Sequence, residues 1–384
     1  MPDWGVSVYP GTPDVPERLP GYLDAVSARG GREVFTSLHI PEVPLAGSVA
    51  QLEHLTAEAG RRGMAVVADI APGALAELGA RPGDLAVLQR MGLAGLRLDY
   101  GFEPEEIAAF TRNPEGLRIV LNASTADPAF LARVMAAGAD PARLEACHNY
   151  YPRPETGLSR ESLLRSSAYF KAHGLRVAAF IAGIGGRRGP IGAGLPTLEE
   201  HRNAEAGRAA GELLGTGVVD TVLFGDPWAT EAELDRVAEA VAAGRLATAG
   251  GRRKEEGGAR TDAGGWRLRV RLVPGLDPIQ RSLVLDRPHR NRPDAAALVI
   301  RCALSRSYAA QGPAVIPFNT AARPAGAVTI DNEGYGRYSG ELQVALADLL
   351  ADPRVNVVGH VVPEDLPLLR LIGPDAPFRF SEVP

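Results

Sequence analysis

The 384-residue sequence has only two cysteines, Cys147 and Cys302, and they lie far apart along the chain. A disulfide framework needs several cysteines at short spacings, so the sequence excludes one and predicts two reduced thiols. A basic and apolar leader segment is absent, as is any run of about 20 apolar residues that could span a bilayer. We therefore expect a cytoplasmic protein without a membrane partner.

An excess of positive charge is also absent, since the formal net charge is -5 at pH 7. Nucleic-acid-binding surfaces usually need a basic excess, so we expect no nucleic-acid partner. No H-x-H or HExxH arrangement occurs, which argues against a metal site. With 45% hydrophobic and 23% charged residues the composition is that of an ordinary globular protein, and a small-molecule partner is the interpretation that remains. The sequence predicts no particular oligomeric state.

Eight short β-rich runs alternate with helix-length amphipathic segments between residues 1 and 247. Such alternation is typical of a parallel α/β fold, and eight is the strand number of a TIM barrel. A doubly wound open sheet would alternate in the same way, but no G-x-G-x-x-G follows the first run. We therefore predict a (β/α)8 TIM barrel over residues 1–247. The expected strands are 5–9, 33–39, 65–70, 95–99, 118–122, 144–148, 176–181 and 221–224.

A change of character follows the expected barrel. Residues 248–265 include the run GGRRKEEGGARTDAGG, whose glycines and charges predict a linker. Residues 266–384 then show alternating apolar and polar positions, which predict a smaller, mainly-β domain. We expect strands at 266–273, 282–285, 298–301, 327–330 and 355–361, and one helix at 341–350.

Polar side chains stand at the ends of the expected barrel strands. A TIM barrel builds its site from strand ends and the loops after them, so these side chains are candidates for ligand contacts. A carboxylate at the end of an apolar strand loses hydration without gaining packing, which also favours a functional role. The candidates are Tyr9, His39, Asp69, Arg97, Asp99, Asn122, His148 and Asn149.

Asp69 and Asp99 end neighbouring strands, about 4.8 Å apart, so their carboxylates would face each other across the barrel mouth. Such a pair suits glycoside hydrolysis, in which one carboxyl group protonates the leaving oxygen and the other stabilises or attacks the sugar. Alternatively, each aspartate caps the following helix or pairs with Arg97.

Two loops after strands extend the candidate site. The run CHNYYPRPETG (147–157), with Tyr151, has the aromatic and hydrogen-bonding side chains that hold sugar rings, or it is a rigid proline-containing loop. The run AGIGGRRGPIGAG (182–194) carries Arg187 and Arg188. Its glycines free backbone N–H groups to face a ligand, which predicts an anion site, although a mobile lid would look similar.

Three further runs have both structural and functional interpretations. In TLEEHR (197–202), Thr197 is the expected N-cap of the seventh helix, with Glu200 at the capping-box position. The other members of this run, Glu199, His201 and Arg202, are candidates to face the site. Asp226, in FGDPW, either caps a helix or belongs to the site. Arg337, in DNEGYGRYSGE (331–341), lies in a hairpin loop or meets an anionic group.

Several of these runs together resemble those of a bacterial family of 6-phospho-N-acetylmuramidases, long described only as outer surface or conserved proteins. The resemblance spans nearly the whole chain. The runs that carry it are GVSVYPG, VFTSLHIPE, DIAPGALAELG, LRLDYGF, LNAST, CHNYYPRPETGLS, RGPIGAGLPTLEEHR and DNEGYGRYSGELQVAL.

The resemblance implies a TIM barrel followed by a cyclophilin-like β domain. It also implies hydrolysis of N-acetylmuramic acid 6-phosphate β-1,4-linked to N-acetylglucosamine in peptidoglycan recycling, without a cofactor. Asp69 and Asp99 are the expected catalytic pair, with Glu199 third; the C2 acetamido group of the substrate is an alternative nucleophile. The phosphate and lactyl carboxylate of this substrate need cationic partners. The candidates are Arg187, Arg188, Arg202 and Arg337.

Two other functions are compatible with a polar ring at a barrel mouth. A non-catalytic protein that binds a sugar phosphate or a peptidoglycan fragment would use the same side chains for recognition only. A barrel aldolase or isomerase is less favoured, because no lysine ends any of the eight expected strands and a Schiff-base route needs one.

Overall fold

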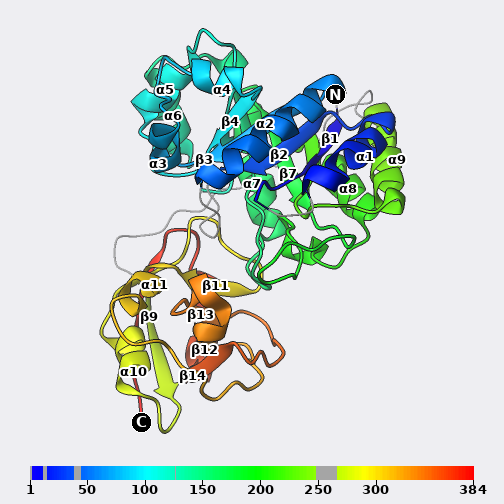
Figure 1. Cartoon of the computed structure of the whole chain (residues 1–384). Helices are drawn as coiled ribbons and strands as arrows, with labels where there is room; N and C mark the ends of the chain where they lie inside the picture. Colours follow the sequence, from blue (N-terminus) through cyan, green and yellow to red (C-terminus); the bar gives the residue numbers. More distant parts are fainter. Residues whose placement is uncertain (1, 12–14, 39–44, 126, 248–265) are drawn as a thin grey trace. The chain divides into compact units, whose positions relative to one another are not determined.

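The structure, a computed structural model, describes residues 2–11, 15–38, 45–125, 127–247 and 266–384 (Figure 1). The chain forms two compact units. The barrel unit comprises Met1–Pro154 and Arg160–Arg253, and the second unit comprises Glu155–Ser159 and Lys254–Pro384. The expected linker, 248–265, lies outside the described residues, as does His39.

Eight parallel strands form a closed barrel in chain order, and β1 pairs with β8 to close it. The TIM-barrel prediction is therefore confirmed, and each strand begins and ends within two residues of an expected run. The strands are β1 (Asp3–Ser7), β2 (Glu33–Ser37), β3 (Ala65–Ile70), β4 (Gly95–Leu98), β5 (Arg118–Asn122), β6 (Leu144–Cys147), β7 (Arg176–Ile181) and β8 (Thr221–Phe224).

Amphipathic helices connect the strands and lie around the outside of the barrel (Figure 1). In α1, for example, Val15, Leu19, Leu23 and Val26 recur at helical spacing and are buried. The helices are α1 (Val15–Ala28), α2 (Leu45–Arg61), α3 (Pro72–Glu77), α4 (Ala86–Arg90), α5 (Pro104–Thr111), α6 (Pro128–Ala136), α7 (Arg160–Ala172), α8 (Ala206–Gly215) and α9 (Glu231–Ala247).

The expected start of the seventh helix is wrong. Helix α8 begins at Ala206, because the Glu205 carboxylate accepts the N–H groups of the first turn and acts as its N-cap. Thr197 is buried instead, where its hydroxyl donates to the Asn149 carbonyl and accepts the N–H of Phe180. The run TLEEHR thus lies in the β7–α8 connection, where residues Glu199–His201 form the short 3₁₀ helix η2.

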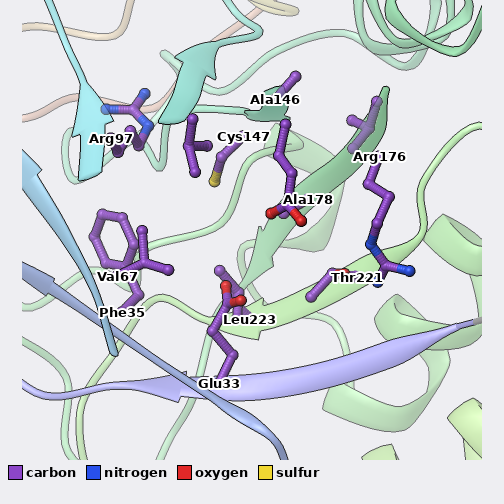
Figure 2. A pocket seen from close by; sticks show the side chains of 13 residues that line it. Glu33, Phe35, Val67, Arg97, Ala146, Cys147, Arg176, Ala178, Thr221 and Leu223 are labelled. Atoms are coloured by element: carbon purple, nitrogen blue, oxygen red, sulfur yellow. Dashed lines mark hydrogen bonds between the residues drawn. The ribbon is translucent and has the colours of Figure 1, made fainter. Parts of the chain in front are cut away.

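The barrel interior is a packed core. Inward-facing side chains, among them Phe35, Val67 and Leu223, converge on its axis (Figure 2). The cavity that they line has a volume of about 10 Å³, room for about one water molecule. At the N-terminal ends of the strands, Arg118 bridges Glu33 and Glu145. A ligand as large as a sugar therefore does not enter the barrel and has to bind at the carboxyl ends of the strands.

The second unit is mainly β, as expected. Its seven strands form one sheet in the order β10-β15-β9-β14-β12-β13-β11 around an apolar core. The strands are β9 (Trp266–Leu272), β10 (His289–Arg290), β11 (Val299–Cys302), β12 (Ala327–Asp331), β13 (Leu342–Ala345), β14 (Val355–Val361) and β15 (Pro377–Glu382). The helices of this unit are α10 (Pro278–Leu285), α11 (Leu304–Ala309) and α12 (Leu366–Leu369).

Two expected elements of this unit are wrong. Residues 282–285 end helix α10, which starts at Pro278 with Asp277 as its N-cap, and do not form a strand. Residues 341–350 do not form a helix, because β13 occupies their first half and pairs with β11 and β12. Helix propensity is a weak prior, and two neighbouring strands supply the backbone partners here.

Candidate active site

Two carboxylates meet one arginine at the carboxyl ends of β3 and β4. Arg97 Nη1 donates to Asp69 Oδ1 at 2.7 Å and to Asp99 Oδ1 at 2.9 Å. Successive inward positions on a strand are two residues apart, so Arg97 and Asp99 share the inner face of the barrel, and Asp69 is the register partner of Arg97. The two Oδ1 atoms are therefore no farther apart than the sum of those two distances.

Two amides complete the group, which we call the mouth cluster: Asp69, Arg97, Asp99, Asn122 and Asn149. Arg97 Nη2 donates to Asn149 Oδ1 at 2.5 Å. Asn122 Nδ2 donates to Asp99 Oδ1 at 3.0 Å and to Asn149 Oδ1 at 3.2 Å. The structure thus brings together five of the residues that the strand-end pattern predicts.

Burial sets the electrostatics of the mouth cluster. The Arg97 side chain is only 3% exposed, whereas those of Asp69 and Asp99 are 15% and 28% exposed and can be reached from outside. Burial raises the pKa of Asp69 to about 7, with Arg97 opposing the rise and Asp99 adding to it. A carboxyl group of this kind can hold a proton near neutral pH, as a general acid must.

An aromatic and cationic group borders the cluster. The Tyr9 hydroxyl donates to the Gly225 carbonyl at 2.7 Å, and its ring packs edge-on against Tyr150. The Arg188 guanidinium lies 3.9 Å from the centre of the Tyr9 ring, and Nη1 donates to the Tyr150 hydroxyl at 2.9 Å. Arg188 also opposes the rise in the pKa of Asp69, so its positive charge acts on the mouth cluster.

The structure places Tyr150 here, not Tyr151. Tyr151 is 4% exposed, and its backbone carbonyl accepts from Arg202. Two adjacent tyrosines give the same sequence signal, so residue type could not choose between them. The end of the same run belongs to the second unit, where Glu155 forms a bidentate ion pair with Arg323 at 2.6 and 2.7 Å.

The prediction of a backbone anion cradle in the glycine-rich run is wrong for three of its N–H groups. Those of Gly183, Arg188 and Ile184 donate to protein carboxylates, the first two to Asp226 and the third to Glu233. An N–H group that already bonds a buried carboxylate cannot also hold a phosphate. The run also presents the Arg188 side chain to the mouth.

Asp226 is the main residue whose role sequence reasoning missed. It is fully buried and is not a helix cap, because Thr230 and Glu233 form the capping box of α9. Its partners lie 31 to 43 residues away in sequence, so no local pattern announces them.

His148 is not available to a ligand. Its ring is fully buried, with Nδ1 3.1 Å from Ser124 Oγ and Nε2 2.8 Å from Ser167 Oγ. Burial lowers the pKa of His148 to about 3, so the ring is neutral. Its role is structural, since it links the end of β6 to Ser124 and to Ser167 of α7.

Glu199 and Arg202 pair with each other instead of facing the mouth cluster. Both of their hydrogen bonds measure 2.6 Å, and Arg202 also donates to the carbonyls of Tyr151 and Gly194. With the Glu199 side chain 9% exposed, the pair holds loops together. The structure therefore corrects both expectations: Glu199 as the third catalytic carboxylate and Arg202 as an anion site.

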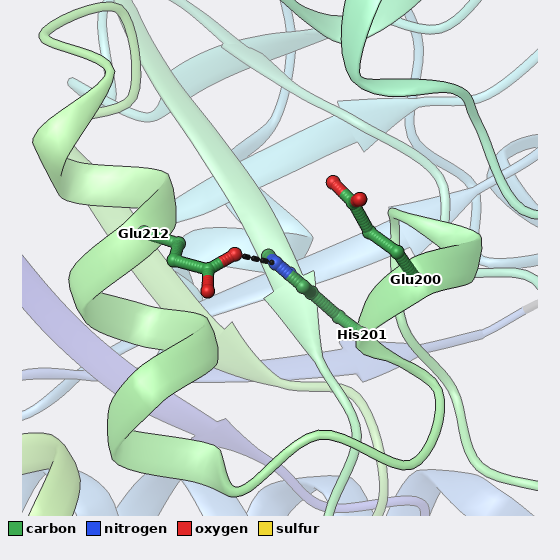
Figure 3. A group of neighbouring side chains, drawn as sticks. All are labelled: Glu200, His201 and Glu212. Atoms are coloured by element: carbon green, nitrogen blue, oxygen red, sulfur yellow. Dashed lines mark hydrogen bonds and ion pairs between the residues drawn. The ribbon is translucent and has the colours of Figure 1, made fainter.

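His201 belongs to a separate group with Glu200 and Glu212, whose ligand atoms lie within 4.8 Å of one another (Figure 3). The His201 side chain is 1% exposed and its Nε2 lies 3.0 Å from Glu212, so it too does not face the mouth. Arg160 donates to Glu200 at 2.8 Å and to Glu212 at 2.7 Å. A guanidinium thus already supplies the positive charge that a metal ion would bring, and we interpret the group as an ion-pair network.

The remaining cationic candidates differ in position. Arg187 is exposed and donates to Asn203 at 3.2 Å. Arg337 lies in the second unit, in the 3₁₀ helix η3 (Glu333–Tyr338), with its guanidinium 5.4 Å from the Tyr338 ring centre. Both remain predictions.

A TIM barrel with paired carboxylates at its mouth has the arrangement of a glycoside hydrolase. Family models agree: "6-phospho-N-acetylmuramidase, N-terminal" matches residues 4–239, and "6-phospho-N-acetylmuramidase, C-terminal" matches residues 266–381. The chain belongs to the 6-phospho-N-acetylmuramidase family, a family of glycosidases.

Two solved structures are similar over the whole chain. A conserved protein from Enterococcus faecalis with an unknown function is 34% identical over 99% of this chain and 96% of its own, with a TM-score of 0.56. An uncharacterized B. cereus protein is 31% identical over 100% of both chains, with a TM-score of 0.55. No curated protein sequence matches this chain. Among the helices that the structure describes, none is long and apolar enough to cross a membrane.

Proposed function

We propose that the protein hydrolyses N-acetylmuramic acid 6-phosphate β-1,4-linked to N-acetylglucosamine, in the cytoplasm, as a step of peptidoglycan recycling. The observation that carries the proposal is that Asp69 and Asp99, both held by Arg97 Nη1 at the barrel mouth, keep 15% and 28% of their side chains exposed and so within reach of a ligand. Family membership supports the choice of a 6-phosphorylated muramic acid sugar. No cofactor takes part in the proposed reaction.

In this mechanism Asp69 is the general acid. It holds a proton because burial raises its pKa, and it gives that proton to the glycosidic oxygen as the bond to C1 breaks. Asp99 faces the donors of Arg97 and Asn122, and it supplies negative charge to the oxocarbenium-like centre. Arg97 fixes the two carboxyl groups relative to each other.

The spacing of the two carboxyl groups predicts the stereochemical result. Retaining glycosidases separate them by about 5–5.5 Å, and inverting enzymes by about 6.5–9.5 Å. The contact with one nitrogen keeps the two Oδ1 atoms below the inverting range. Attack by Asp99, or by the C2 acetamido group that Asp99 orients, retains the configuration. Proton NMR of the first-formed product should therefore show the β-anomer, and an α-anomer would exclude this mechanism.

The pKa of Asp69 predicts the pH dependence. A general acid works only when protonated, so kcat/KM should fall as the pH rises through about 7. Asp99 raises the pKa of Asp69, so this pKa should be lower in Asp99→Asn. The residual activity of the variant should therefore begin to fall at a lower pH than that of the wild type. The substrate phosphate, with a second pKa of about 6, stays the same in both enzymes and cannot cause that difference. Activity that rises through pH 7 would make Asp69 a base.

Arg188 is the proposed partner of an anionic group on the substrate, and Arg187 and Arg337 are further candidates. Arg188→Ala should raise KM for the 6-phosphorylated disaccharide about 10-fold or more, because a charge-assisted hydrogen bond is lost. Arg165→Ala, which removes an exposed arginine of α7 that pairs with Glu161, is the matched control. Unchanged KM in Arg188→Ala would remove this residue from the binding site.

The test of the proposal compares the 6-phosphorylated disaccharide with the unphosphorylated one. The purified protein should release N-acetylglucosamine from the first far faster than from the second. Binding of the first without cleavage of either would support a non-catalytic sugar-phosphate or peptidoglycan-fragment binding protein instead.

A further inference from the structure

The glycine-rich loop, residues 183–195, is held by the carboxylate of Asp226, which follows β8. Asp226 Oδ2 accepts the N–H groups of Gly183 at 3.0 Å and Leu195 at 2.8 Å. Asp226 Oδ1 accepts the N–H group of Arg188 at 3.1 Å. One buried side chain therefore fixes both ends of the loop and the arginine near its middle.

Glu233 adds a fourth contact from the start of α9. Its Oε1 accepts the N–H group of Ile184 at 2.7 Å, while Oε2 accepts from Thr230. The segment that follows β8 thus holds the loop at four of its backbone N–H groups.

The backbones of the two segments also touch directly. A Cβ atom at Gly185 would collide with the Trp228 carbonyl oxygen, and one at Gly225 would collide with that of Leu195. Glycine is needed here for close approach, which fits a loop held in one place. These glycines argue against the alternative of a freely moving lid.

The loop delivers one charged group to the mouth, the guanidinium of Arg188. Its backbone N–H is held by Asp226, and its side chain lies on the Tyr9 ring and donates to the Tyr150 hydroxyl. Its positive charge lowers the pKa of Asp69, so the two side chains interact electrostatically. An anionic group on a sugar bound at the mouth cluster would meet this charge.

We propose that Asp226 is a positioning residue: by holding the loop it fixes Arg188 at the barrel mouth, and so makes the site select a substrate with an anionic group. The inference rests on the proposed glycosidase function. Asp226 itself takes no part in proton transfer, because its two oxygens are occupied by three N–H groups of the loop.

Asp226→Asn tests this with little change in size. The new amide would place an NH2 group against N–H donors that the carboxylate now accepts, so the loop loses contacts. Asp220→Asn is the matched control, because Asp220 precedes the same strand and accepts the N–H of Val177 at 2.8 Å, far from the loop. It should affect folding in a similar way without moving Arg188.

The kinetic readout is the preference for an anionic substrate. Asp226→Asn should raise KM for the 6-phosphorylated disaccharide about 10-fold, with kcat within about threefold, and Asp220→Asn should leave both unchanged. Two analogues identify the anion: the disaccharide without its 6-phosphate, and the 6-phosphorylated disaccharide without its lactyl group. The wild type should bind one of these analogues much more weakly than the full substrate, and in Asp226→Asn that difference should be lost. The group that this analogue lacks is the anion that Arg188 meets.

A double-mutant cycle separates positioning from general damage. If Asp226 acts through Arg188, adding Asp226→Asn to Arg188→Ala should change KM by less than about twofold. A further 10-fold loss in that background would overturn the proposal. If Asp226→Asn does not fold, Glu233→Gln, which leaves one acceptor oxygen for the N–H groups of Ile184 and Thr230, should shift KM in the same direction by less.

Trypsin gives a readout that needs no substrate. Cleavage after Arg187 or Arg188 should be at least 10-fold faster in Asp226→Asn than in the wild type or in Asp220→Asn. Binding of N-acetylmuramic acid 6-phosphate, which carries both the phosphate and the lactyl carboxylate, should weaken in the same variant only, as measured by titration calorimetry. If Asp226→Asn shows faster trypsin cleavage and weaker binding but the wild type cleaves no substrate, the glycosidase proposal fails and the positioning role of Asp226 stands. Unchanged cleavage and binding in Asp226→Asn would defeat the positioning role alone.

Discussion

Asp69→Asn is expected to lower kcat by at least about 10²-fold, because the amide has no proton to give to the leaving oxygen. Asp99→Asn should cause a loss of similar size, since it removes the negative charge that stabilises the sugar cation. Single-turnover kinetics on both variants measures these losses at the chemical step.

Asp69→Asn should stay folded. Burial raises the pKa of Asp69, which means that its charged form is costly in the folded protein, so a neutral asparagine should not lower Tm. Glu145→Gln is the control, because Glu145 is an interior carboxylate of the same barrel that pairs with Arg118 at the opposite end. It should keep its activity. Rates near that of the wild type in both aspartate variants would remove them as catalysts.

Arg97→Gln is expected to have the second large effect, again about 10²-fold or more in kcat. The guanidinium is 3% exposed and bonds both carboxyl groups, so its loss frees their positions and removes the cation that pairs with Asp99. Breaking such a buried pair typically costs about 3–5 kcal/mol of stability. Denaturant unfolding and steady-state kinetics measure the two effects.

The pH profile distinguishes this role from simple instability. Arg97 opposes the rise in the pKa of Asp69, so its removal should move the alkaline limb of kcat/KM to higher pH. Arg118→Gln removes an interior arginine that also bridges two carboxylates. It should lower stability without shifting the limb, whereas the same shift in both variants would contradict the assignment.

The barrel and much of the mouth cluster could be predicted from sequence because both follow from strand geometry. Alternation of short apolar runs with amphipathic segments indicated the strands. A period of two places Arg97, in β4, and Asp99, directly after it, on the same face. Polar residues at strand ends then had to converge, since parallel strands end at the same rim.

The errors have a common cause in contacts between distant parts of the chain. Arg202 looked like a site residue, but its guanidinium donates to the carbonyls of Tyr151 and Arg153, 51 and 49 residues away. Residues 341–350 have helix-forming side chains, but strands β11 and β12 pair with their first half. In Asp226 the same limit appears at the site, because its acceptor role depends on the fold of a loop more than 30 residues away.

The central claim, that Asp69 and Asp99 hydrolyse a glycosidic bond at the mouth of this barrel, is tested most directly in ¹⁸O-labelled water. The wild type, given the 6-phosphorylated disaccharide, should release N-acetylglucosamine without label, and N-acetylmuramic acid 6-phosphate with one ¹⁸O at C1. Asp69→Asn should release almost none of either. Mass spectrometry that finds no cleavage, or label in N-acetylglucosamine instead, would contradict the account.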